Sequence, residues 1–207
     1  MPNITVHIIE SVALSDLSAR RTEGGMLAQS LALAGMSSTY QQTVDQNAFK
    51  QAIADISCVA QSAEQSLTAI HFSCHGGPTH IVLTSGEEIY WPELRPLLVP
   101  VNRAASGNLI VSMSTCYGLF GAGMALHPHE TPFRSLIGPL DIVTFADSAV
   151  AFTVFYHQVS KGVSIERAVE AMKVASGEKH FGLIDGETTR AAVRDAIIAA
   201  GLKIPEA

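Results

Sequence analysis

Two short apolar runs, each ending in a reactive side chain followed by glycine, constrain this chain more than any other feature. The first, Ala69–Gly77 (Ala-Ile-His-Phe-Ser-Cys-His-Gly-Gly), leads to His75, and the second, Leu109–Gly118 (Leu-Ile-Val-Ser-Met-Ser-Thr-Cys-Tyr-Gly), leads to Cys116. Short apolar runs bounded by turn residues are typical of buried strands. The spacing between the two runs leaves room for a crossover helix, so the strands can be parallel neighbours in one sheet.

The carboxyl ends of parallel strands meet at one edge of a sheet, where such folds place their sites. We therefore expect His75 and Cys116 to lie together, with Cys116 as a nucleophile and His75 as its general base. The backbone N–H groups of Gly76 and Cys116 are the expected oxyanion donors. The alternatives are a buried structural cysteine, a turn histidine and a simple glycine turn.

The segments His-Phe-Ser-Cys-His-Gly-Gly and Val-Ser-Met-Ser-Thr-Cys-Tyr-Gly resemble the histidine and cysteine motifs of the caspase-like cysteine peptidases, and most closely the CHAT branch. Phe155-Tyr156 and Gly162-Val163-Ser164 match the spacing of a helix pair in that family. The resemblance implies a caspase-like three-layer α/β sandwich and a cysteine endopeptidase acting on a protein or peptide substrate. Family members are often fused to repeat or sensor domains, which this sequence does not show, so any activator is expected to be a separate protein.

The remainder of the chain alternates expected strands and helices, which favours a three-layer α/β sandwich with a mainly parallel central sheet. No repeat or low-complexity linker interrupts it, and we expect residues 1–207 to form a single domain. Pro96 and Pro100 are expected to keep the helix that begins near Trp91 short. The expected inner strands are Ile4–Ile9, Leu67–Ser73 and Asn108–Ser114.

Composition restricts the partners and the compartment. The chain is 47% hydrophobic and 15% charged, which favours a compact globule. A net charge of −6 without a basic tract disfavours nucleic acid, and no apolar stretch reaches the length of a membrane span. The first residues lack the basic and apolar regions of a secretory signal, and three cysteines fit a reducing compartment. We therefore expect a cytoplasmic protein with neither nucleic acid nor membrane as a partner.

The substrate preference depends on which charged residue reaches the site. Asp147 follows an expected strand supplied by Leu136-Ile137-Gly138 and Asp141–Phe145. Its carboxylate is predicted to select arginine or lysine before the scissile bond, as in several caspase-like relatives. A helix cap is its alternative role. The opposite possibility is that Arg20 or Arg21, in the loop after the first strand, selects an acidic residue as in caspases, although such a pair is commonly solvated. We predict cleavage after a basic residue.

Two other interpretations remain open. One is a zinc site, since imidazole and thiolate suit that metal, but no Cys-x-x-Cys or His-Glu-x-x-His pair occurs and we expect neither a metal nor a cofactor. The other is a catalytically silent caspase-like binding or scaffold module. The residues that such a zinc site would draw on are His71, Cys74, His75, His80 and Cys116.

Two of these residues, which neighbour the motif, have ordinary expected roles. His71 is expected to pack in the core, and Cys74 is expected to be inert.

Overall fold

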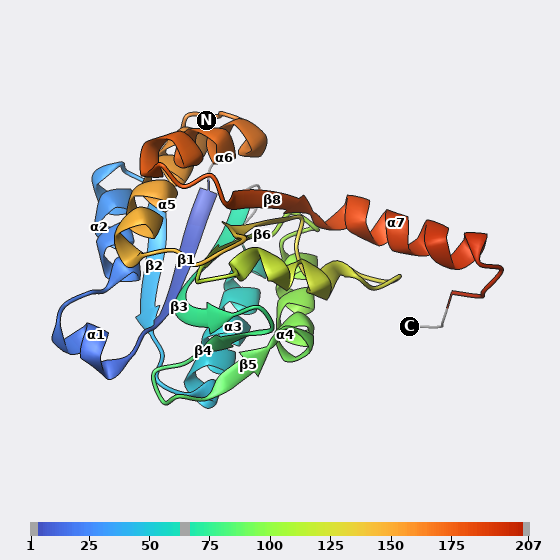
Figure 1. Cartoon of the computed structure of the whole chain (residues 1–207), viewed down its shortest axis with the longest axis horizontal. Helices are drawn as coiled ribbons and strands as arrows, with labels where there is room; N and C mark the ends of the chain where they lie inside the picture. The colour runs from blue at the N-terminus through green and yellow to red at the C-terminus, as the bar shows by residue number, and fades with distance from the viewer. Residues whose placement is uncertain (1–3, 63–66, 205–207) are drawn as a thin grey trace.

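The fold is an α/β sandwich, seen in a computed structural model that describes residues 4–62 and 67–204. Within these residues eight strands form one mixed sheet (Figure 1). The strands are β1 (Ile4–Ser11), β2 (Ser37–Gln42), β3 (Leu67–Gly77), β4 (His80–Val82), β5 (Glu88–Tyr90), β6 (Ile110–Ser114), β7 (Ser135–Pro139) and β8 (Phe181–Asp185). The helices are α1 (Leu14–Ser18), α2 (Glu23–Leu33), α3 (Gln46–Ser62), α4 (Trp91–Ala104), α5 (Phe145–Ser160), α6 (Ile165–Ser176) and α7 (Gly186–Ala199), with a 3-10 segment η1 (Gly118–Ala125).

The main sheet has the order β2-β1-β3-β6-β7-β8 and is parallel except for β8, which runs antiparallel to β7. The three strands predicted as inner ones, β1, β3 and β6, lie side by side away from the edges. The predicted three-layer α/β sandwich with a mainly parallel sheet is therefore confirmed. β3 and β6 are direct neighbours, so their carboxyl ends bring the two sequence motifs to the same edge.

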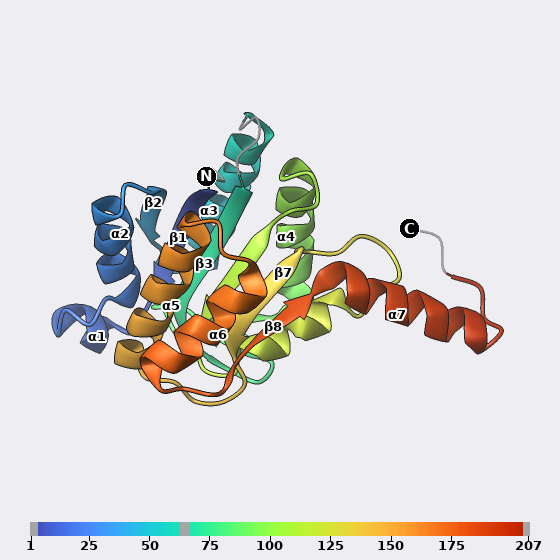
Figure 2. The same ribbon diagram turned by 90° about the horizontal axis from the view of Figure 1, so that it is seen from above.

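Helices cover both faces of the sheet (Figure 2). One hydrophobic core lies between the sheet and helices α3 and α4, and Ile70 and Phe72 of β3 belong to it. The other lies between the sheet and helices α2, α5 and α6, and Ala69 of β3 belongs to it. Because side chains alternate along a strand, His71, Ser73 and the end of β3 at His75 belong to the α2/α5 face. Helix α7 extends away from this body at the far end of β8 (Figures 1 and 2).

The strand that carries His75 is longer than predicted. Instead of ending at Ser73, β3 continues to Gly77, because residues 75–77 pair antiparallel with β4. The predicted hairpin beside the site is present as β4 and β5, and it lengthens β3 beyond the parallel part of the sheet. His75 thus lies just past the parallel ladder, where its side chain is 45% exposed.

Helix α4 shows why the prediction of a short helix near Trp91 was wrong. It has 14 residues and contains Pro96 and Pro100. Together with Pro92, these prolines are spaced four residues apart and are all exposed, so the carbonyl groups that lose an intrahelical donor face water. The opposite face is buried, and its packing offsets the two missing hydrogen bonds; it consists of Trp91, Leu94, Leu98 and Val101.

The strand expected from Leu136-Ile137-Gly138 and Asp141–Phe145 is present only in its first part, as β7, and residues 141–145 form no strand. Phe145 begins α5, and Thr144 caps that helix by accepting a hydrogen bond from the Asp147 N–H at 3.1 Å. The helix cap at Thr144 therefore decides the local structure, although the β-branched Ile142 and Val143 favour a strand. Asp147 consequently lies in the first turn of a helix and not at the end of a strand.

The described residues include no helix with both the length and the apolar character needed to cross a bilayer.

Candidate active site

His75 is held by a residue that the sequence analysis did not single out. Its Nε2 lies 2.8 Å from Oδ2 of Asp16, which follows β1 in the short helix α1. β1 pairs with β3 as far as the Ser11–Cys74 pair, so the segment after β1 emerges beside His75. A signal for Asp16 did exist, since it is an acidic residue just after a strand expected to end at this edge.

Asp16 is buried although it is charged, with 9% of its side chain exposed. Its other oxygen, Oδ1, accepts hydrogen bonds from Arg21 Nε at 2.9 Å and Nη2 at 2.5 Å. The hydrogen bond from His75 holds the pKa of the Asp16 carboxyl below its usual range, and Arg21 acts in the same direction. Asp16 is therefore a carboxylate at neutral pH and accepts the Nε2–H of His75.

Cys116 lies in the turn between β6 and η1, two residues beyond the end of β6 and two before the start of η1. Its side chain is half-buried, and the thiol donates to the carbonyl oxygen of Val143 at 3.6 Å. The next residue, Tyr117, has a φ of 59°, which is uncommon for a side chain of this size. Sparsely populated backbone conformations of this kind gather at functional sites, and this one turns the chain sharply after the sulfur.

Gly76 allows the two motif strands to approach closely. A Cβ at this position would lie 2.3 Å from Oγ1 of Thr115 and 2.9 Å from the carbonyl oxygen of His80. Any larger residue would push the loop that carries Cys116 away from β3. The glycine is part of the β3–β4 ladder, opposite Ile81, so the alternative of a simple turn at Gly76 is not met, and the turn lies at residues 78 and 79.

His75 and Cys116 line the same pocket, which has a volume of about 400 Å³. One wall of the pocket is formed by the first turn of α5. There the ring centroids of Phe145 and His75 are 5.2 Å apart. The dyad expected from sequence is thus brought to one cavity. The complete lining is Arg21, Cys74, His75, Ser114, Thr115, Cys116, Val143, Thr144, Phe145, Ala146 and Ser148.

The three residues expected to choose the substrate are placed differently from one another. Arg21 lines the pocket, but its guanidinium is bonded to Asp16. Arg20 is exposed and is not part of the lining. Asp147 is also outside the lining, and its Oδ2 accepts the Thr144 hydroxyl at 2.6 Å. The alternative of a helix cap is not met either, since Thr144 is the cap of α5 and Asp147 lies in its first turn.

The pocket floor contains hydroxyl groups that have no hydrogen-bond partner among the described residues. They belong to Ser114, Thr115 and Ser148, each of which is at most 2% exposed. Buried hydroxyls normally find partners, and these three oxygen atoms are too deeply buried to meet a ligand in the pocket directly. Cys74 lies beside them, and its burial raises the pKa of its thiol. That is the direction expected for an inert cysteine.

His71 belongs to a separate buried cluster. Its Nε2 lies 3.2 Å from Glu23, and both side chains are fully buried. Its ring packs edge-on against Phe152, with the hydroxyl of Tyr156 3.5 Å from Nδ1. His71 therefore packs in the core as predicted. Over residues 4–62 and 67–204, no three His, Cys, Asp or Glu side chains are arranged to hold a metal ion.

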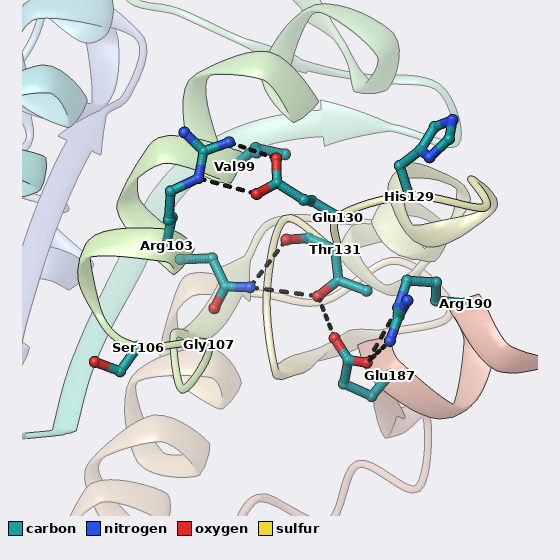
Figure 3. Close-up of a pocket in the computed structure, with 10 residues that line it drawn as sticks. Val99, Arg103, Ser106, Gly107, His129, Glu130, Thr131, Glu187 and Arg190 are labelled. Carbon is teal, nitrogen blue, oxygen red and sulfur yellow. Dashed lines mark hydrogen bonds and ion pairs between the residues drawn. The ribbon is translucent and has the colours of Figure 1, made fainter. Parts of the chain in front are cut away.

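A larger cavity, of about 590 Å³, lies between the end of α4 and the start of α7 (Figure 3). Its polar groups bond to one another: Asn102 donates to Thr131, the Thr131 hydroxyl donates to Glu187, and Arg103 pairs with Glu130. None of the site residues predicted from sequence lines this cavity. Because these polar groups are already hydrogen-bonded to one another, we interpret the cavity as a structural contact between neighbouring segments and not as a binding site.

Comparison with known proteins adds no family assignment: no protein-family model matches the chain, and a search of curated proteins finds no matching relative. The geometry of the pocket is therefore the basis for assigning a class of site.

Proposed function

We propose that this chain is a caspase-like cysteine endopeptidase in which Cys116 is the nucleophile and His75 the general base. The observation that supports this most is that a histidine and a half-buried cysteine, at the ends of neighbouring parallel strands, line one pocket. Sites of α/β folds form at this edge of the sheet. The pocket volume is in the range of cavities that take a small ligand or a side chain of a bound peptide.

In the proposed reaction, His75 takes the proton of the Cys116 thiol, and the sulfur attacks the carbonyl carbon of the scissile peptide bond. The carbonyl oxygen becomes an oxyanion, for which the N–H groups of Gly76 and Cys116 are the proposed donors. His75 then gives its proton to the leaving amine, and the C–N bond breaks to leave a thioester. Water, deprotonated by His75, hydrolyses the thioester and restores the free thiol.

The chemistry requires a reduced thiol, which agrees with a cytoplasmic location as part of this proposal. The substrate is proposed to be a protein or peptide segment that binds across the edge of the sheet. The resemblance to CHAT-type peptidases also implies an activator, which we propose to be a separate protein. Neither nucleic acid nor a membrane is proposed as a partner.

One contact favours a second candidate function, a catalytically silent binding module. The hydrogen bond of the Cys116 thiol goes to Val143 and, within the described residues, not to His75. A peptidase needs the sulfur to release this carbonyl when substrate binds, whereas a binding module does not. Catalytic contacts are often loose without substrate, so the first candidate is preferred.

A thiol-reactive peptide probe, combined with a peptide library, tests the proposal. We expect the wild-type protein to cleave library peptides and to be labelled at Cys116, and we expect Cys116→Ala to lose both properties. Cys74→Ala and Cys58→Ala are matched controls, because Cys74 is buried and Cys58 is exposed on α3. Labelling at Cys116 without any cleavage, with or without cell extract as a source of activator, would favour the binding module.

A further inference from the structure

Asp16 uses both of its carboxylate oxygens inside the protein. Oδ2 faces Nε2 of His75, and Oδ1 receives the Nε and Nη2 groups of Arg21. The Arg21 side chain is 56% exposed and Asp16 is 9% exposed, so the guanidinium covers the carboxylate from the solvent side. Both Arg21 nitrogens bond the same oxygen, Oδ1, and these charge-assisted hydrogen bonds leave Oδ2 to face His75.

The backbone is shaped to return Arg21 to Asp16. Arg20 has a φ of 55°, in the left-handed region that is unfavourable by about 1–2 kcal/mol for a residue with a side chain. This turn lets the Arg21 N–H donate to the Asp16 carbonyl oxygen at 2.8 Å. The Asp16–Arg21 contact is thus a built feature of the loop and differs from a pair of solvated side chains.

We infer that Asp16 is a positioning residue for His75, and that Arg21 holds Asp16 in this role instead of binding substrate. The inference rests on the proposed function. A carboxylate that accepts Nε2–H fixes the neutral imidazole in the tautomer with an unprotonated Nδ1. Nδ1 is then the nitrogen that takes the proton of Cys116, and Asp16 stabilises the imidazolium that results.

The substitution Asp16→Asn separates this role from simple packing, because Asn has nearly the same shape. Arg21 has only donors, so the Asn oxygen stays with the guanidinium and the amide NH₂ turns toward His75. Nε2 must then accept a hydrogen bond, and the proton moves to Nδ1, where it blocks the base. We expect kcat to fall by roughly 10³–10⁴-fold with little change in KM.

The double variant Asp16→Asn/Arg21→Met gives the sharpest test. Without the guanidinium, the amide is free to rotate and to offer its oxygen to Nε2–H, which restores the productive tautomer. We therefore expect the double variant to be more active than Asp16→Asn alone, by roughly tenfold or more, as is possible for residues in one network. If Arg21 bound substrate instead, the double variant would be the less active of the two, and the inference would be overturned.

Nitrogen NMR of His75 in a Cys116→Ala background provides a measurement that needs no catalysis. We expect the shifts to report Nε2–H with Asp16 present and Nδ1–H after Asp16→Asn. An Nδ1–H ring in the presence of Asp16, or a tautomer that the substitution leaves unchanged, overturns the inference. If the NMR shifts show the expected tautomers but the wild-type protein cleaves no peptide, the proposed function is overturned. The control of the His75 tautomer by Asp16 is then still established.

Discussion

Two histidine–carboxylate pairs lie four residues apart on the same face of β3, and they differ mainly in their access to solvent. His71 and Glu23 are 3.2 Å apart and fully buried, whereas His75 and Asp16 are 2.8 Å apart with the imidazole 45% exposed. The deeper pair is enclosed by aromatic rings, including Phe152. The outer pair faces a pocket that also contains Cys116. Similar chemistry is thus used once to fill the core and once at a surface where a substrate can reach it.

The comparison also shows that proximity of a carboxylate to a histidine does not identify a site. The inner pair is the more strongly desolvated of the two, and breaking it leaves an unpaired polar group in the core. The outer pair gains its proposed role from the nucleophile beside it and from the open cavity. We therefore expect substitutions in the inner pair to affect stability and substitutions in the outer pair to affect activity.

The largest expected effect is on catalysis, from His75→Ala. Removing the proposed base should lower peptide cleavage by roughly 10³–10⁴-fold, as loss of one member of a cooperating group does. The free energy of unfolding should change by less than about 1 kcal/mol, because the side chain is half-exposed. Initial rates on a library-derived peptide, together with urea unfolding, measure both quantities.

His80→Ala is the matched control for this substitution. His80 lies in the same hairpin and interacts with Glu88 at 3.6 Å, but it does not line the pocket. Its removal should leave the rate within a few-fold of wild type. An equal loss of activity in both variants would mean that the hairpin, and not the imidazole of His75, is required.

The next largest effect is on stability, from Glu23→Ala. Truncation leaves the His71 imidazole buried without its partner at Nε2, and a buried polar group left unsatisfied in this way costs about 1–3 kcal/mol. Glu88→Ala removes the partially exposed partner of His80 and should change the unfolding free energy by less than about 1 kcal/mol. Chemical denaturation of the two variants makes the measurement. Similar values for both would contradict the distinction between an inner structural pair and pairs near the surface.

The two strands that end near His75 and Cys116 were readable from sequence because each is a short apolar run followed by glycine. The role of Asp16 was only partly readable: an acidic residue just after β1 is a signal, but its contact with His75 depends on α1 folding back over the end of that strand. Likewise, Ile142 and Val143 resemble a strand in isolation. The sequence did hold a signal for the start of α5, because Thr144 and Asp147 have the spacing of a helix N-terminus, and the structure shows the contact between them.

Acid should weaken the outer pair through Asp16. The pKa of this carboxyl in the folded protein lies below its unfolded value of 3.8, chiefly because of the hydrogen bond from His75. The stabilisation it supplies is therefore complete above about pH 4 and is lost as the pH falls through the folded-state pKa. Wild type should lose stability more steeply than Asp16→Asn over this acidic range, as measured by urea unfolding from pH 6 to pH 2.5. Parallel curves for the two proteins would show that Asp16 contributes nothing to the acid dependence.

The smallest expected effect comes from Asp147→Ala, which tests whether selectivity lies in the pocket lining. Asp147 interacts with Thr144 and the positive end of α5, so its loss should cost about 0.3–1 kcal/mol of stability. Because it does not line the pocket, the ranking of basic, neutral and acidic library peptides should be the same as for wild type. Ser148→Ala is the informative partner, since Ser148 is on the same helix and lines the pocket, so its substitution should alter that ranking. A loss of preference for basic residues in Asp147→Ala, with no change in Ser148→Ala, would instead mean that α5 moves when substrate binds and brings the carboxylate into the pocket.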